Sequence, residues 1–429
     1  MNRWGIITAT MTKPLNLRFP KRFFWGAATS AHQVEGNTHN NWTVWELENA
    51  KSLAKQAEYK ISHLPVWPEI REAATSPENY VSGIAIDHYN RYELDFDIAQ
   101  KLHLNAFRFS IEWSRIEPEQ GRWDSAEIQH YREYIAALKK RGLEPMVTLF
   151  HWTTPVWFAE KGGFERSSNV KYFVRFADKI LQELGNDLRY ITTINEPDTV
   201  AIHGYFTQEH PPQKHSIPKA IWVYRNMLLA HKRIYKIGHR TSRRFKIGFT
   251  KSYAWLRPAD QTRMTRIGIR GDFWLRDDLP LAYVGKKTDF IGVNYYFTDL
   301  HRGLKVVHDG GQHNDLGWEM RPDDLEEVLI RLGKHKKPIL VTESGAADRN
   351  DEYRQWWIAH SLQSINSALH QGIEVIGYLH WSLLDNFEWA YGRWPRFGLV
   401  EIDYKNNLKR TVRKSGIWYG QVVKKMRGL

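Results

Sequence analysis

Eight short runs rich in apolar, β-branched or aromatic residues recur along the chain, and they constrain its fold more than any other feature. The runs cover residues 24–29, 106–110, 144–151, 190–195, 246–253, 290–295, 339–343 and 375–381. Segments with helical periodicity separate most of them, at residues 125–141, 170–184, 217–238 and 354–371. Repeated strand–helix units favour a mostly parallel sheet, and eight such units favour its closure. We therefore predict an α/β protein built as a single (β/α)8 TIM barrel.

The spacing of the runs predicts one domain with one excursion. No linker rich in Ser, Gly or Pro and no shift in composition divides the 429 residues. We expect residues 17–429 to form this domain and residues 1–16 to be a disordered extension, with Met11 as an alternative start. Residues 46–82 are expected to leave the barrel after the first strand, with helical patches at 50–60 and 69–74.

Composition excludes several classes of protein. The chain has no Cys, which excludes disulfide frameworks, thiolate metal sites and cysteine nucleophiles. A hydrophobic fraction of 42% excludes a disordered chain. The N-terminus lacks the apolar core of a signal peptide, and no stretch approaches the roughly 20 apolar residues that span a bilayer. We expect a soluble, cytoplasmic protein with no membrane partner.

Positive charge is concentrated in one part of the sequence. Lys and Arg number 61 against 48 Asp and Glu, a formal net charge of +13, and residues 210–259 contain no acidic residue. This pattern fits a nucleic-acid surface, or a solvated helix face whose acidic partners come from elsewhere in the fold. No helix-turn-helix, zinc-finger or RNA-recognition signature accompanies the charge. We favour the second interpretation and expect no nucleic-acid partner.

Polar or aromatic side chains stand at the ends of seven of the eight predicted strands. They are Gln33, Arg108, His151 with Trp152, Asn195 with Glu196, Asn294 with Tyr296, Glu343, and Trp381. The carboxyl ends of barrel strands converge on one open face, so these residues are predicted to share one site. The fifth strand ends at Lys251, Ser252 and Tyr253, which fit no role in this set.

Glu196 and Glu343 follow the fourth and seventh strands, on opposite sides of the predicted barrel mouth. Two carboxyl groups placed in this way are what glycosidic bond cleavage requires. A single Glu at a strand end is more often a salt-bridge partner or a helix cap, but the pair favours catalysis. A divalent metal held by carboxylates and His151 is the alternative. The sequence has no His-x-x-x-His or clustered Asp to support it, so we expect neither a metal nor a cofactor.

Eight ordered motifs carry a resemblance to a known family. They include FWGAATSAHQVEG at residues 24–36, DHYNRY at 87–92, RFSIEWSRI at 108–116, HW at 151–152, NEP at 195–197, NYY at 294–296, TESG at 342–345 and WSLLDNFEW at 381–389. Together they resemble glycoside hydrolase family 1, the β-glucosidase and β-galactosidase family. The match runs from about residue 17 to the C-terminus, so the resemblance implies that residues 17–429 form a glycoside hydrolase catalytic domain.

The resemblance implies a role for each matching residue. Glu196 would be the general acid/base and Glu343 the nucleophile of a retaining double displacement, with Arg108 and Tyr296 supporting the nucleophile. Asn195 would bind the sugar 2-hydroxyl. The remaining substrate-binding residues would be Gln33, His151, Trp152, Asn294, Trp381, Glu388, Trp389 and Phe397.

The resemblance also narrows the substrate. Relatives that act on 6-phosphorylated sugars replace the pair Glu388-Trp389, which this sequence keeps. We therefore expect hydrolysis of unphosphorylated β-D-glucosides, with galactosides or fucosides as alternatives, and a small β-glycoside or short oligosaccharide as the partner. The alternative function is a catalytically impaired barrel that binds glycans or associates with nucleic acid. The oligomeric state is left open.

Three departures from the family pattern lead to further expectations. Ser344 replaces the usual Asn after the nucleophile and is expected to loosen the positioning of Glu343. The segment 254–289 is shorter than usual, so the fifth crossover helix is expected to be reduced or missing, with the barrel open or mobile there. The loop 207–217 is short, which puts the family's leaving-group preference in doubt.

Overall fold

The computed structural model describes residues 17–307 and 311–429, and its core is a closed parallel barrel. Its eight strands are β1 (Phe24–Ala28), β2 (Ala106–Ser110), β3 (Glu144–Thr148), β4 (Tyr190–Asn195), β5 (Lys246–Pro258), β6 (Phe290–Arg302), β8 (Ile339–Ser344) and β9 (Val375–Trp381). The sheet order is β5-β4-β3-β2-β1-β9-β8-β6, and β5 pairs with β6 to close it. This confirms the predicted (β/α)8 TIM barrel. The expected extension at residues 1–16 lies outside the described residues.

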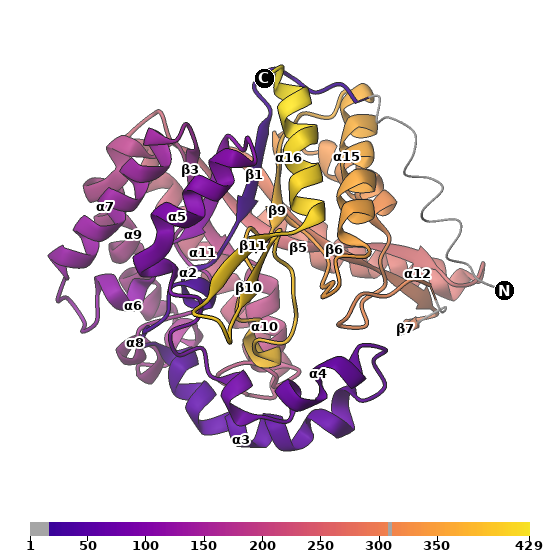
Figure 1. Cartoon of the computed structure of the whole chain (residues 1–429), viewed down its shortest axis with the longest axis horizontal. Helices are drawn as coiled ribbons and strands as arrows, with labels where there is room; N and C mark the ends of the chain where they lie inside the picture. Colours follow the sequence, from indigo (N-terminus) through magenta and orange to yellow (C-terminus); the bar gives the residue numbers. More distant parts are fainter. Residues whose placement is uncertain (1–16, 308–310) are drawn as a thin grey trace.

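Helices surround the barrel (Figure 1). They include α5 (His88–Lys101), α7 (Ser125–Lys140), α9 (Val170–Leu184), α11 (Ile217–Thr241), α14 (Leu325–Gly333), α15 (Arg354–His370) and α16 (Lys414–Arg427). Each buries one apolar stripe against the strands; in α9 the stripe includes Phe173, Phe176 and Ile180. Within the described residues, no helix has the length and apolar character needed to cross a membrane.

The excursion after the first strand is helical, as predicted, but it begins earlier. It contains α3 (Asn41–Ile61) and α4 (Trp67–Ala74), which Figure 1 shows together at one edge of the molecule. The side chain of Asn40 accepts hydrogen bonds from the backbone of Trp42 and Thr43, and Thr43 Oγ1 accepts one from the Asn40 backbone. This capping box starts the helix before the apolar periodicity becomes visible in the sequence.

The expectation of a reduced or missing fifth crossover helix is wrong. The connection contains α12 (Arg263–Phe273), the π-helical turn η6 (Trp274–Asp278) and α13 (Leu279–Val284), with no break between them. The sheet is not open at this point either, because β5 pairs with β6 from Gly248 opposite Phe290 to Pro258 opposite His301, with one register shift. Both strands extend beyond the predicted ends, which shortens the connection without removing its helix.

Two small antiparallel features complete the sheet structure. The strand β7 (Lys305–Val307) folds back on the end of β6 and makes a hairpin beside α12. The pair β10 (Val400–Asp403) and β11 (Lys409–Val412) lies between the last barrel strand and α16. Inside the barrel the packing is apolar, with Ala28, Ala106, Met146, Phe290, Leu340 and Leu379 in one buried cluster. Polar side chains therefore lie at the carboxyl ends of the strands.

Candidate active site

The predicted site residues come together at the carboxyl ends of the barrel strands. They line a cavity of about 660 Å³, whose walls include Gln33, His151, Trp152, Asn195, Glu196, Tyr296, Glu343, Trp381, Glu388, Trp389 and Phe397. Arg108 and Asn294 join the set through hydrogen bonds to the two carboxylates. A partly closed cavity with convergent polar groups is the usual form of a small-molecule site.

Glu343 lies at the end of β8 and is held by two donors. Arg108 Nη1 donates to its Oε1, and the Tyr296 hydroxyl donates to its Oε2 at 2.6 Å. Both donors are almost fully buried. Burial, followed by the charges of Glu343 and Glu196, raises the pKa of Tyr296 well above its ordinary value, so Tyr296 keeps its proton and donates. The surroundings of Glu343 therefore complement a carboxylate anion.

Glu196 has different surroundings. It caps the N-terminus of α10 (Pro197–Tyr205) with a left-handed φ of 44°, and Pro197 starts the helix, where its missing N–H costs nothing. Asn294 Nδ2 donates to its Oε1 at 2.7 Å and the Thr199 hydroxyl donates to its Oε2 at 2.8 Å. Burial raises the pKa of Glu196 to about 8, with further contributions from the charges of Glu343 and Asp198.

A hydrogen-bonded chain links Glu343 to His151 through Arg108 and Asn195. Arg108 Nη2 donates to Asn195 Oδ1 at 2.7 Å, and Asn195 Nδ2 lies 3.1 Å from His151 Nε2. Burial, then the charges of Arg108 and His32, keep the pKa of His151 well below its ordinary value, so its imidazole is neutral. Its Nδ1 has no hydrogen-bond partner within the described part of the chain and is available to a polar group of a ligand.

The loop after β9 supplies a third carboxyl group, Glu388. Gln33 Nε2 donates to the Phe387 carbonyl at 2.8 Å and lies 3.4 Å from Glu388 Oε2. Burial raises the pKa of Glu388 to about 8, followed by the charges of Glu343 and Glu196. Gln33 and Glu388 are therefore held side by side in the wall of the cavity.

Aromatic rings form the remaining walls of the cavity. His151 is stacked against Trp381 and Trp389, with interplanar angles of 23° and 14°. Trp152 packs on Trp389 with ring centroids 4.6 Å apart. Indole planes match the apolar C–H face of a pyranose, whereas the amides and carboxyls match its hydroxyl rim.

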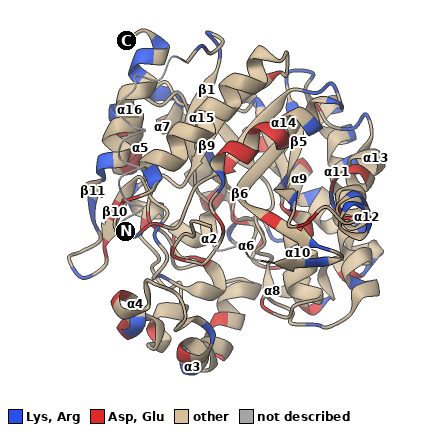
Figure 2. Cartoon of the chain, turned by 90° about the vertical axis from the view of Figure 1, so that its right-hand side faces the viewer, with Lys and Arg blue, Asp and Glu red and all other residues tan. Residues whose placement is uncertain are grey.

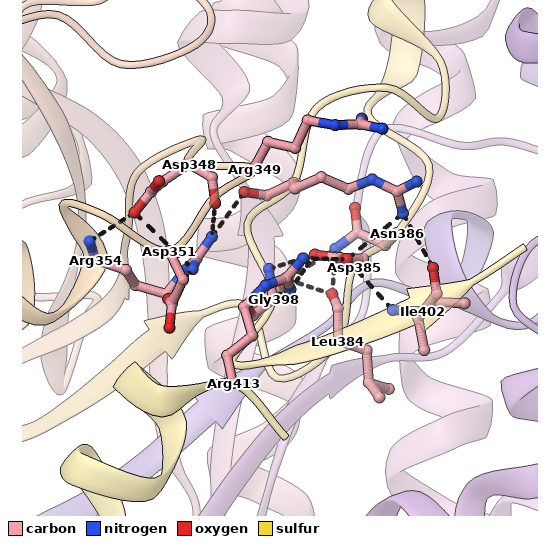
Figure 3. A network of polar contacts seen from close by, with 12 residues as sticks. Asp348, Arg349, Asp351, Arg354, Leu384, Asp385, Asn386, Gly398, Ile402 and Arg413 are labelled. Carbon is pink, nitrogen blue, oxygen red and sulfur yellow. Dashed lines mark hydrogen bonds and ion pairs between the residues drawn. The ribbon is translucent and has the colours of Figure 1, made fainter. Parts of the chain in front are cut away.

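Buried ion pairs fix the loop that carries Glu388 and Trp389 (Figure 3). Asp385 accepts from both Nη atoms of Arg413 at 2.9 Å and from the backbone N–H of Gly398 at 3.0 Å. Burial opposes ionisation of Asp385, but the guanidinium groups of Arg413 and Arg396 hold its pKa below the ordinary value. Because Arg413 precedes α16, the C-terminal helix is tied to the wall of the cavity.

The Ser344 side chain does not contact the Glu343 carboxylate. Its hydroxyl accepts a hydrogen bond from Trp357 Nε1 of α15 at 3.0 Å, on the outer side of β8. Arg108 and Tyr296 hold Glu343 independently of this contact. The expected loosening of Glu343 by Ser344 has no counterpart in these contacts.

The sequence did not predict a buried polar cluster near Glu196, which consists of Lys251, Asp198 and Asp277. Lys251 is fully buried at the end of β5, and its Nζ lies 3.1 Å from Asp198 Oδ2 and 3.2 Å from Asp277 Oδ1. Thr199, next to Asp198 on α10, donates to Glu196. The apolar-to-polar switch at Lys251 was visible in the sequence, but its partners lie on α10 and η6 and only the fold brings them together.

The basic stretch 210–259 is partly paired. Lys214 and Lys219 contact Glu165, and Arg257 contacts Asp324. Lys219 is on α11, Lys214 precedes that helix and Arg257 is on β5, so the preferred interpretation of a solvated helix face stays a prediction. Among the described residues, no group of three or more His, Asp or Glu side chains is arranged to hold a metal ion.

Comparison with known proteins gives matches over nearly the whole chain. The family model described as Glycosyl hydrolase family 1 matches residues 15–270 and 276–427. The chain is 30% identical to "Beta-glucosidase A" of Thermotoga maritima, over 95% of this chain and 98% of that protein. It is 28% identical to "1,4-beta-D-glucan glucohydrolase" of Thermotoga neapolitana, again over 95% and 98%.

Solved structures of similar proteins also match over nearly the whole chain. The β-glucosidase of Thermotoga maritima in complex with glucoimidazole superposes with a TM-score of 0.85 at 27% identity, covering 96% of this chain and all of that one. The β-glycosidase of Pyrococcus horikoshii superposes with a TM-score of 0.83 at 32% identity, covering 96% and 98%.

Proposed function

Because the chain belongs to glycosyl hydrolase family 1, we propose that it hydrolyses unphosphorylated β-D-glucosides with retention of configuration, using Glu343 as nucleophile and Glu196 as acid/base. The protein is a β-glucosidase-like glycoside hydrolase, and the alternative of a barrel that only binds glycans or associates with nucleic acid is not favoured. Residues 17–429 form the catalytic domain in this proposal. A cytoplasmic location stays a prediction.

The assignment of nucleophile and acid/base rests on one observation: the carboxyl groups of Glu343 and Glu196 differ in the charge of the groups around them. Glu343 faces a guanidinium and a phenol, both donors. Glu196 faces neutral donors and lies near Asp198, with its pKa raised to about 8. At neutral pH the raised pKa supports Glu196 as the protonated acid, and the two donors at Glu343 suit a carboxylate that acts as the nucleophile, the two roles that a retaining glycosidase needs.

The reaction follows from these protonation states. A carboxylate oxygen of Glu343 attacks C1 of the glucoside while Glu196 gives its proton to the departing oxygen, which leaves as the alcohol. The product of this step is a glucosyl ester of Glu343. A water molecule then gives a proton to the Glu196 carboxylate and attacks C1, which releases glucose and regenerates Glu343. Two inversions at C1 give net retention.

The walls of the cavity support the substrate class. Trp381 offers a plane for the sugar ring, and Gln33, His151 and Glu388 present polar atoms at its edge. An ionised Glu388 would repel a phosphate at the 6-position, and a protonated one would still offer it no cation. The names of the relatives, β-glucosidases among them, support glucose as the preferred sugar.

Product analysis with rescued variants tests the proposal. Glu343→Ala should lose turnover of 4-nitrophenyl β-D-glucoside, and azide should restore it with an inverted α-glucosyl azide as product. Glu196→Ala should respond to azide by forming the retained β-glucosyl azide. Glu401→Ala removes an exposed carboxylate of β10 and serves as the matched control with unchanged turnover. Absence of turnover by folded wild-type protein on glucoside, galactoside and fucoside would overturn the proposal.

A further inference from the structure

Exposed apolar side chains gather on α12, η6 and the hairpin between β6 and β7. Met264, Ile267, Trp274, Leu275, Leu304 and Val306 are each 50% to 72% exposed, and we call these six residues the rim surface. The helix and the hairpin touch, since a Cβ at Gly268 would lie 2.5 Å from the Gly303 carbonyl oxygen and 3.2 Å from Leu304. Exposed apolar groups gathered in this way indicate an interaction site.

The rim surface is continuous with the cavity that holds Glu196 and Glu343. Leu275 and Val306 line that cavity, together with Ile202 and Phe206 of α10, which are themselves more than 40% exposed. The cavity therefore joins the catalytic carboxylates to the rim surface along a mixed wall, to which Asp272, Arg276 and Asp299 also contribute. Figure 1 shows α12 and β7 projecting at one side of the molecule, away from α16.

Basic residues flank the apolar side chains. Arg263, Arg266 and Arg270 recur at helical spacing on the exposed side of α12, and the hairpin adds Arg302 and Lys305. Figure 2 shows the basic residues of α12 in blue. In the described ranges, none of the three α12 arginines forms an ion pair. An arginine stripe beside an apolar stripe that contains Trp is the pattern of a helix that lies in a membrane interface.

Against the expectation from the sequence that the protein has no membrane partner, we propose that the rim surface and its arginines bind an anionic lipid bilayer. The apolar side chains enter the region between headgroups and acyl chains, and the arginines contact lipid phosphates. The mouth of the cavity then faces the membrane. If the proposed glucosidase function holds, this position gives Glu196 and Glu343 access to β-glucosides whose aglycone is a membrane lipid.

The charges argue against other partners for this surface. A second copy of the chain packed on the same surface would bring the arginines of the two copies together, because a two-fold contact is self-complementary. A nucleic acid would satisfy the arginines but would leave Met264, Ile267 and Leu304 without suitable contacts. A bilayer with anionic headgroups satisfies both stripes.

Vesicle sedimentation with the full chain tests the proposal. Wild-type protein should sediment with vesicles of phosphatidylglycerol and phosphatidylcholine, and less with phosphatidylcholine alone. The triple variant Arg263→Gln, Arg266→Gln and Arg270→Gln should bind the anionic vesicles about a hundredfold more weakly, at roughly fivefold for each charge. The double variant Ile267→Ser and Trp274→Ser should lose binding to both kinds of vesicle.

Matched controls separate this surface from net charge and from folding. Lys414→Gln, Lys424→Gln and Lys425→Gln remove three exposed charges from α16, and this variant should bind vesicles much as the wild type does. All variants should keep the wild-type turnover of 4-nitrophenyl β-D-glucoside, so vesicle binding is read separately from catalysis. Equal binding by the two triple variants, or wild-type protein that stays in the supernatant, would refute the proposal. A wild-type dimer that the α12 variants dissociate would assign the surface to a second copy instead.

Discussion

At the scale of single residues, the surroundings of Glu196 set the expected pH dependence. Its burial and its carboxylate neighbours raise its pKa to about 8, and it must be protonated to act as an acid. We expect kcat/KM for an alkyl β-glucoside, whose leaving group needs a proton, to fall about tenfold per pH unit above pH 8. Glu196→Gln should lower this rate by roughly 10²- to 10⁴-fold and remove the fall at high pH. A wild-type profile that is flat to pH 10 would contradict the assignment.

Asp198 offers a second test at the same scale. Its charge is one of the causes that raise the pKa of Glu196, and Lys251 Nζ lies 3.1 Å from it. Asp198→Asn removes that negative charge, so the high-pH fall in kcat/KM should move to lower pH. Lys251 keeps Asp277 as a partner in this variant, which limits the loss of stability. The control is Asp278→Asn, which removes a half-exposed carboxylate paired with Arg331 and should leave the profile unchanged.

At the scale of elements, the link between the loop after β9 and α16 is the critical contact. Arg413→Met leaves the buried Asp385 with a single ion-pair partner within the described residues, Arg396, whose Nη1 lies 3.5 Å from Asp385 Oδ2. We expect a loss of about 3–5 kcal/mol in the free energy of unfolding, measured by urea denaturation at neutral pH. Lys409→Met on exposed β11 is the control and should change stability by less than about 0.5 kcal/mol.

The ion pair between Asp385 and Arg413 also predicts how the stability of the protein depends on pH. Because the folded-state pKa of Asp385 is lowered, its contribution is present above the ordinary carboxyl pKa and is lost as pH falls through the folded value. The deficit of Arg413→Met should therefore be largest near neutral pH and should shrink in acid. A deficit that is constant between pH 7 and pH 3 would show that lost packing, and not the ion pair, is responsible.

At the scale of the whole molecule, closure between β5 and β6 decides whether the barrel is rigid. Ten residue pairs join the two strands, from Gly248–Phe290 to Pro258–His301. We expect backbone amides of residues 248–253 to exchange with solvent as slowly as those of β8, measured by hydrogen–deuterium exchange. Amides of α12 should exchange faster, because one face of that helix is exposed. Rapid exchange throughout β5 would restore the hypothesis of an open barrel.

The sequence by itself determined the barrel and the two catalytic candidates. Strand runs and helical stripes are local patterns, and the motifs around Glu196 and Glu343 stand at strand ends that any closed parallel barrel brings together. The family resemblance also predicted the partners of Glu343, Arg108 and Tyr296, but not the contacts of Glu196 with Asn294 and Thr199.

Only the tertiary structure decided which distant residues meet. The role of Lys251 became clear only from the fold, in which α10 and η6 bring Asp198 and Asp277 within ion-pair distance of it. The lengths of β5 and β6 likewise depend on the pairing of these two strands with each other. The α12 helix was missed as a helix, and its exposed apolar stripe could not be told from a buried one by periodicity. The physical reason is the same in each case: burial and long-range pairing depend on the packing of segments far apart in the chain, which no local pattern records.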